Sequence, residues 1–250
     1  MTGGAAAALI TDLDGTLVDS EAHYLATVRA VFTSYGVRRV ERDVYARCTG
    51  LSTRDMLVLL RRHYRVRAPV DALMDDIVRV YRSGLPDRVP LFPAAAALLL
   101  QAHAGGLPTA VASGSPARIV AAVLEGHGLS HAVDAQVAAE DVRAGKPAPD
   151  LFLHAAHSLG VAPERCLVLE DSVPGVEAAA RAGMRCVAVP DPATAHAPSA
   201  FASAALVLPR DDLARVGELL DCGTDTRTYV RNQETPRLSG AVPTGGGNRR

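Results

Sequence analysis

Two aspartates, Asp12 and Asp14, flank Leu13 at the end of an apolar run. In an extended chain, side chains two residues apart project to the same side. Carboxylates placed in this way can share a hard cation while one of them attacks an electrophile. Gly15 lets the backbone turn tightly after the pair, and Thr16 adds a hydroxyl. The same residues also fit a plain Asx-type turn that ends a strand.

A hydroxyl follows the next apolar run, at Ser113 in VASGSP. Ligands of open α/β sheets bind at the carboxyl ends of the strands. A hydroxyl there, beside Gly114 and ahead of a helix N-terminus, suits a phosphate oxygen. The alternative is structural, since Ser115 can simply cap the helix that follows.

The chain contains 25 arginines and one lysine, Lys146. In the segment AGKPAPD, Pro147 and Pro149 prevent a long regular element, so Lys146 is expected in a rigid loop before a helix. A single lysine in an arginine-rich chain indicates a position that needs a compact ammonium. Such a group can neutralise an attacking carboxylate and a transferring phosphoryl group. A solvated surface lysine is the ordinary alternative.

Two adjacent acids, Glu170 and Asp171, end the apolar run that begins at Cys166. Adjacent acids at the carboxyl end of a strand repel each other unless a cation lies between them. Four chemically distinct elements therefore fall at strand ends or in the loops that follow strands. We expect them to meet at one edge of a sheet.

Strand-like and helical patterns alternate through most of the chain, which predicts an α/β protein with a doubly wound parallel sheet. Between 20 and 87 the helical patterns follow one another without a convincing strand, which predicts an all-helical insert. We therefore expect a core of 1–19 and 88–221, a helical cap of 20–87, and a disordered polar, Gly-rich tail of 222–250. The predicted strands are Thr109–Ala112, Cys166–Leu169 and Cys186–Val189; the predicted helices are His23–Tyr35, Arg42–Cys48, Ser52–Tyr64, Val70–Tyr81, Pro93–Ala104, Pro116–Glu125, Pro149–Leu159 and Pro174–Ala182.

Composition argues against several classes of protein. The formal net charge of -1 and the absence of Trp do not favour a nucleic-acid partner. No apolar run approaches the roughly 18 residues that a membrane span requires. The N-terminal segment lacks the basic region of a secretory signal. We expect a soluble cytoplasmic protein with no membrane partner.

In this order, DLDGT at 12–16, Ser113, Lys146 in GKPAPD, and EDSVPG at 170–175 resemble the four motifs of the haloacid dehalogenase superfamily. The resemblance covers about Ala7 to Pro190. It implies a Rossmann-like core with a helical cap inserted after the first motif. The length and position of the insert resemble the β-phosphoglucomutase-like subfamily, whose members are mostly small-molecule phosphatases.

The resemblance also implies a role for each motif residue. Asp12 would attack phosphorus to form an aspartyl-phosphate, and Asp14 would protonate the leaving alcohol and then activate water. Thr16 would support the general acid. The Mg²⁺ ligands would be the Asp12 carboxylate, the Asp14 backbone carbonyl and Asp171, with Glu170 in support; Ser113, Gly114 and Lys146 would bind the phosphoryl oxygens.

Four other readings compete with a phosphatase. A haloacid dehalogenase proper lacks the second Asp of the first motif, and a phospho-Asp receiver carries its paired acids before the phosphorylated Asp. A non-catalytic binding protein has little reason to keep every charged group of the chemistry. The runner-up is a sugar-phosphate mutase, which places a His shortly after the first motif and a Lys on the cap. Here Tyr24 appears at that position, His23 is one residue early, and the cap has no Lys.

Substrate identity lies in the cap. A cap that closes over the strand ends excludes a large polymer, so we expect a small phosphorylated metabolite as substrate. Sugar, polyol and glycolate phosphates all remain open. Arg54, which follows the turn at 50–53, is the candidate for substrate contact. A capped monomer would function without partners, although a homodimer is left open.

Overall fold

The computed structural model describes residues 4–48, 51–85, 87–192 and 197–220 of the chain. The predicted disordered tail, 222–250, lies outside the described residues. Within the described ranges, no helix is both long enough and apolar enough to cross a lipid bilayer.

Six parallel strands form one sheet in the order β3-β2-β1-β4-β5-β6, which places β1 near its centre. The chain builds β2 and β3 on one side of β1 and then β4, β5 and β6 on the other, which is the doubly wound arrangement. The predicted α/β, Rossmann-like fold class is confirmed. The strands are β1 Ala8–Thr11, β2 Thr109–Ala112, β3 Ala135–Val137, β4 Cys166–Glu170, β5 Arg185–Ala188 and β6 Leu206–Val207.

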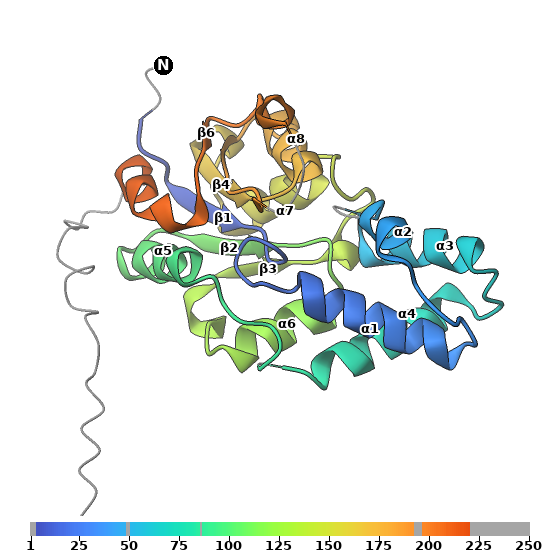
Figure 1. The fold of residues 1–250 in the computed structure, drawn as a ribbon. Helices are drawn as coiled ribbons and strands as arrows, with labels where there is room; N and C mark the ends of the chain where they lie inside the picture. The colour runs from blue at the N-terminus through green and yellow to red at the C-terminus, as the bar shows by residue number, and fades with distance from the viewer. Residues whose placement is uncertain (1–3, 49–50, 86, 193–196, 221–250) are drawn as a thin grey trace, which may run out of the picture.

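Alternate residues of each strand point to opposite faces of the sheet, and each face packs against its own helices. In β1, Leu9 belongs to one hydrophobic cluster, while Ala8 and Ile10 belong to another. Helices α5 and α6 cover the Leu9 face, and α7 and α8 cover the opposite face (Figure 1). These helices are α5 Pro93–Ala104, α6 Ala117–Gly126, α7 Asp150–Leu159 and α8 Val173–Arg181.

Four helices between β1 and α5 form the cap, which lies at one end of the molecule (Figure 1). Their buried side chains join the cluster on the Leu9 face, so the cap and the sheet share one continuous apolar core. The chain leaves and re-enters the core at one place, because the Asp19 N–H donates to the Pro90 carbonyl at 2.8 Å. The cap helices are α1 Glu21–Ser34, α2 Arg42–Ala46, α3 Thr53–His63 and α4 Val70–Arg82.

The structure also contains elements that the sequence does not predict. Strands β3 and β6 have three and two residues, too few to show a strand periodicity. A 3-10 helix at Arg210–Leu219 packs beside α5 and closes the described part of the core. The predicted helices all occur, with limits that shift by no more than two residues at either end.

Candidate active site

The predicted motifs meet at the carboxyl edge of the sheet because β1 lies between β2 and β4. Thr11, the last residue of β1, pairs with Val111 of β2 and with Leu169 of β4. The residues that follow, Asp12 and Ser113, and the last residue of β4 therefore lie at the same level. The backbone holds this register, since the Asp12 N–H donates to the Leu169 carbonyl at 2.9 Å.

Lys146 reaches this edge from the loop between β3 and α7, and its ammonium lies between two carboxylates. Its Nζ donates to Asp12 Oδ1 and to Glu170 Oε1, and it lies 5.2 Å from the centre of the Phe152 ring. The side chain is only 6% exposed, so the alternative of a solvated surface lysine is wrong. Burial lowers the pKa of Lys146, but the negative charges of Asp12 and Glu170 raise it by more. The net shift of this pKa is upward, which keeps the ammonium charged.

Three acids surround this single ammonium. Ligand oxygens of Asp12, Glu170 and Asp171 all lie within 4.8 Å of one another. Burial raises the pKa of Asp12, Lys146 opposes the rise, and Glu170 and Asp171 add to it. Burial and the neighbouring Glu170 raise the pKa of Asp171 to about 7. The cluster therefore holds more buried negative charge than Lys146 compensates, and carboxylate oxygens are the ligands that Mg²⁺ prefers. The residues present fit a divalent cation.

Two glycines make room for these carboxylates. Gly15 has φ of 82°, and a Cβ at that position would come 2.4 Å from Asp171 Oδ2. A Cβ on Gly175 would come 1.9 Å from Glu170 Oε1. The Ser172 side chain caps α8 by accepting the Gly175 N–H at 3.1 Å, which brings the helix start against the acids. Any side chain at 15 or 175 would displace a carboxylate.

Asp14 occupies a different environment from that of Asp12. Its carboxylate contributes nothing to the acidic cluster and instead accepts three serine hydroxyls. Ser20 donates to Oδ1 at 2.7 Å, Ser115 donates to Oδ2 at 2.7 Å, and Ser113 donates to Oδ2 at 3.3 Å. The side chains of the two aspartates thus do not share one cation position, contrary to what their spacing suggests, because the chain turns immediately after Asp12.

Ser115 is not a helix cap. The residue before α6 is Pro116, and no side chain caps that helix. The Ser115 hydroxyl binds Asp14, and the Ser115 N–H donates to Ser113 Oγ at 3.0 Å. The expectation that Ser115 serves as a structural cap is therefore wrong, and its hydroxyl belongs to the candidate site.

The remaining predicted residues divide between the site and the cap surface. The Thr16 hydroxyl donates to Asp171 Oδ1 at 3.1 Å, so it supports an acid of the cluster and not Asp14. The Gly114 carbonyl accepts the Thr53 N–H at 3.2 Å, which joins the loop after β2 to the start of α3. Arg54 forms an exposed ion pair with Asp71 of α4. The structure does not bring the Arg54 guanidinium to the acidic cluster.

Helix α1 directs Tyr24, and not His23, toward the site. The Tyr24 hydroxyl is hydrogen-bonded to Thr53 Oγ1, and burial, with Asp14 as a smaller cause, raises the pKa of Tyr24. His23 lies on another side of the helix, where its Nε2 contacts the Tyr81 carbonyl at 2.8 Å. A one-residue shift in alignment therefore does not restore a histidine at the site.

Sequence reasoning also missed Arg210. Its Nη2 donates to the Gly15 carbonyl at 2.7 Å, and its guanidinium lies 4.3 Å from the centre of the Phe92 ring. Arg210 also lowers the pKa of Asp171, as a smaller influence beside burial. It comes from the 3-10 helix, 195 residues after Gly15, and no local pattern marks it.

The chain resembles known proteins over most of its length. A family model described as haloacid dehalogenase-like hydrolase matches residues 9–189. Fructose-1-phosphate phosphatase YqaB of Escherichia coli is 36% identical over 183 residues, 73% of this chain and 96% of that protein. A crystal structure of CbbY from Rhodobacter sphaeroides with phosphate is 28% identical with a TM-score of 0.78, covering 86% of this chain and 99% of that one. A putative β-phosphoglucomutase from Thermotoga maritima is 26% identical with a TM-score of 0.67, covering 84% and 98%.

Proposed function

Because this chain belongs to the haloacid dehalogenase-like hydrolases, we propose that it hydrolyses the phosphate ester of a small metabolite. The observation that carries the proposal is the contrast between its two neighbouring aspartates. Asp12 lies in a buried cluster of acids against one ammonium, whereas Asp14 is held apart by three hydroxyls. Two carboxyl groups in such different environments suit two different roles in one reaction.

In the proposed reaction, a carboxylate oxygen of Asp12 attacks phosphorus, and the bond between phosphorus and the ester oxygen breaks. Asp14 gives its proton to the departing alcohol oxygen. Water then attacks the phosphorus of the aspartyl-phosphate and gives its proton to the Asp14 carboxylate. Inorganic phosphate leaves and Asp12 is regenerated, so that each turnover consumes one ester and one water.

Lys146 and Ser113 would bind the phosphoryl oxygens, since both side chains already lie at the carboxylates that flank the reacting position. Asp12, Glu170 and Asp171, with the Asp14 carbonyl, would hold Mg²⁺. When bound, Mg²⁺ neutralises charge on the phosphoryl group and on the acids around it. Lys146, which contacts the Asp12 carboxylate, also favours its charged form.

The substrate that we propose is a sugar or polyol phosphate. The support comes from the fructose-1-phosphate phosphatase that the chain resembles over nearly all of that protein's length. The cap also limits the size of the substrate, because Thr53 at the start of α3 contacts Gly114 directly above the strand ends.

The structure favours hydrolysis over the mutase alternative at one particular residue. Tyr24 occupies the position beside Thr53 and Asp14, and burial raises its pKa, so it remains neutral and does not serve as a base at neutral pH. His23 is engaged by the Tyr81 carbonyl on another side of α1. A sugar hydroxyl therefore finds no histidine here to help it compete with water.

The direct test is phosphate release from a panel of sugar, polyol and glycolate phosphates, with Mg²⁺ and with EDTA. We expect release that requires the metal, fastest with a sugar or polyol phosphate. Interconversion of hexose 1- and 6-phosphates without net phosphate release would overturn hydrolysis in favour of the mutase.

Ser115→Ala should slow the reaction selectively for substrates whose leaving group needs a proton. Loss of a hydrogen bond to a charged group costs about 1.5–3 kcal/mol, so kcat for fructose 1-phosphate should fall roughly tenfold or more. The kcat for p-nitrophenyl phosphate, whose leaving group departs without a proton, should change by less than about threefold. An equal loss with both substrates would show that Ser115 does not act through Asp14.

Mg²⁺ should stabilise the folded protein by relieving repulsion within the acidic cluster. At 100 times its Kd, a ligand that binds only the folded state contributes about 2.7 kcal/mol. For a chain of this size we therefore expect Tm to rise by about 5–10 °C. Asp171→Asn should remove most of the rise, while Glu164→Gln, at an exposed acid outside the cluster, should leave it intact. Differential scanning calorimetry checks this, and an unchanged rise in Asp171→Asn would contradict it.

A further inference from the structure

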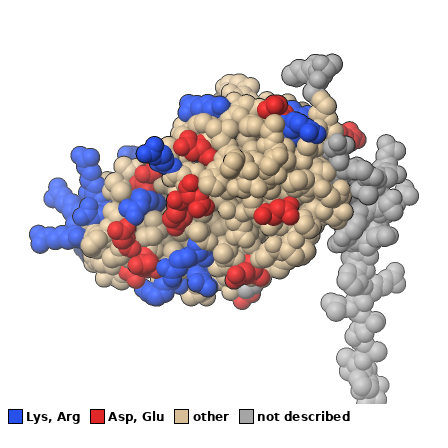
Figure 2. Space-filling model, turned by 180° about the vertical axis from the view of Figure 1, so that it is seen from behind, with Lys and Arg blue, Asp and Glu red and all other residues tan. Residues whose placement is uncertain are grey.

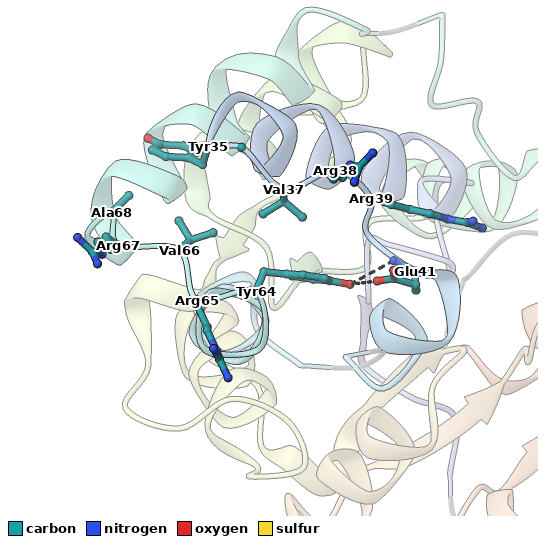
Figure 3. A pocket seen from close by; sticks show the side chains of 11 residues that line it. Tyr35, Val37, Arg38, Arg39, Glu41, Tyr64, Arg65, Val66, Arg67 and Ala68 are labelled. Carbon is teal, nitrogen blue, oxygen red and sulfur yellow. Dashed lines mark hydrogen bonds between the residues drawn. The ribbon is translucent and has the colours of Figure 1, made fainter.

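A hollow lies on the cap, away from the candidate active site, between the loop that follows α1 and the loop that follows α3. It has a volume of about 770 Å³, and we call it the basic cap pocket (Figure 3). Residues 35–39 and 41 line one side and residues 64–68 line the other. Its volume lies in the range of sites that hold small molecules.

The basic cap pocket is separate from the acidic cluster because two helices of the cap lie between them. Helices α1 and α3 both begin beside the site, where Tyr24 contacts Thr53, and both end at the pocket. At 1.5 Å per residue, their 14 and 11 residues span about 21 and 16 Å. The pocket thus opens at the end of the cap that is remote from the proposed reaction.

Four arginines surround the pocket, and Figure 2 shows basic side chains protruding from this end of the molecule. All four are exposed, and none makes a hydrogen bond or ion pair with another described residue through its guanidinium. Arginine forks bind phosphate and carboxylate groups in a bidentate manner. The four come from both loops: Arg38 and Arg39 from the first, and Arg65 and Arg67 from the second.

Glu41 is the one acid that lines the pocket, and it is already engaged. The Tyr64 hydroxyl donates to Glu41 Oε2 at 2.6 Å, and the Glu41 N–H donates to the Tyr64 hydroxyl at 3.1 Å (Figure 3). The Tyr64 hydrogen bond, with Arg39 as a smaller cause, lowers the pKa of Glu41. Glu41 is therefore an anion that fixes the Tyr64 ring in place, and the arginines still outnumber it.

The base of the pocket is apolar. Val37 and Val66 lie between the arginines in Figure 3, and Val66 is 8% exposed. The Tyr64 ring packs edge-on against Phe32 at 5.9 Å between ring centres, so it is rigid where it meets the pocket. An apolar base with a cationic rim suits a ligand that has an apolar or aromatic body and several negative charges.

We propose that the basic cap pocket binds a small organic polyanion of the nucleoside polyphosphate class. The phosphate groups contact the arginines of both loops, and the nucleobase lies over Val37, Val66 and the Tyr64 ring. Because the ligand contacts both loops, it joins the ends of α1 and α3 that lie away from the active site.

The test measures binding of ATP by titration calorimetry in EDTA, on the Asp12→Asn background so that no turnover occurs. Arg39→Gln/Arg67→Gln removes one cation from each loop and should weaken binding roughly tenfold. Arg62→Gln, an exposed arginine of α3 outside the pocket, is the matched control and should change the affinity less than twofold. Glu41→Gln, which keeps the acceptor for Tyr64, should tighten binding.

Two further readouts separate this pocket from the active site and charge from shape. On adding ATP, the amide resonances of Val37 and Val66 should shift in Asp12→Asn and not when Arg39→Gln/Arg67→Gln is added to that background. Pyrophosphate should bind more weakly than ATP, and adenosine should not bind measurably. Equal weakening by Arg62→Gln, or shifts confined to Ser113 and Gly114, would overturn the proposal. The result is independent of catalysis, since neither metal nor turnover takes part in the measurement.

Discussion

Asp12→Asn is expected to lower kcat for phosphate release by roughly 10⁴-fold or more, because it replaces the carboxylate that, in the proposed mechanism, forms the bond to phosphorus. Asparagine has nearly the same shape, and its amide oxygen is a poor nucleophile. Asp12 is only 4% exposed and follows the last residue of β1. Because asparagine has almost the same shape, the substitution should leave the packing around the strand intact. Phosphate release from fructose 1-phosphate in saturating Mg²⁺ measures the effect.

Asp43→Asn is the matched control for this variant, since Asp43 is an exposed acid on the cap. It should keep wild-type kcat. If Asp12→Asn retained more than about a hundredth of wild-type kcat while its Tm was unchanged, Asp12 would not be the nucleophile.

Lys146→Arg is expected to lower kcat/KM by about 10³-fold although it keeps the positive charge. The Lys146 side chain is 6% exposed and its Nζ contacts both Asp12 and Glu170, which leaves no room for a planar guanidinium. Lys146→Met should lose at least as much activity, because the buried Asp12 and Glu170 and the half-buried Asp171 then face one another with no cation of the protein between them.

The opposite exchange at a surface site serves as the control for this second prediction. Arg79→Lys, at an exposed i,i+3 pair with Asp76 on the cap, should keep full activity. Steady-state kinetics with fructose 1-phosphate compares the variants. If Lys146→Arg stayed within tenfold of wild-type kcat/KM, position 146 would need only a positive charge. That result would contradict the prediction that it requires a compact ammonium.

The sequence predicts which side chains lie close together where those side chains stand at the carboxyl end of a strand. Asp12, Ser113 and Glu170 end or follow apolar runs, and parallel strands bring such positions to one edge. Lys146 is predicted from composition, because it is the single lysine in a chain with 25 arginines. In the structure Lys146 donates to Asp12 and Glu170, and Ser113 donates to the neighbouring Asp14.

The sequence predicts poorly those contacts that depend on how a turn closes. The spacing of Asp12 and Asp14 suggests one shared cation, but the turn after Asp12 directs Asp14 toward the hydroxyls of Ser20 and Ser115. Ser115 precedes a helix and therefore resembles a cap, while its hydroxyl is in fact used by a residue from another strand. Local propensity carries no information about a partner 101 residues away.

Long-range contacts of surface arginines are equally invisible in the sequence. Arg210 reaches the Gly15 carbonyl from the other end of the chain, and Arg54 pairs with Asp71 of the neighbouring cap helix. In a chain with 25 arginines, residue type alone does not rank them. Contact between Arg54 and the substrate stays a prediction. The ion pair of Arg54 with Asp71 within the cap gives that prediction no support.

The central claim is that a phosphoryl group passes through Asp12. The most direct test is to quench the enzyme during turnover with fructose 1-phosphate and Mg²⁺, and then to treat it with borohydride, which reduces an acyl phosphate to an alcohol. Mass spectrometry of the tryptic peptide 1–29 then identifies the modified residue. The proposed mechanism predicts homoserine at position 12 and unmodified Asp14. Steady release of phosphate with Asp12 unmodified at every quench time would contradict it.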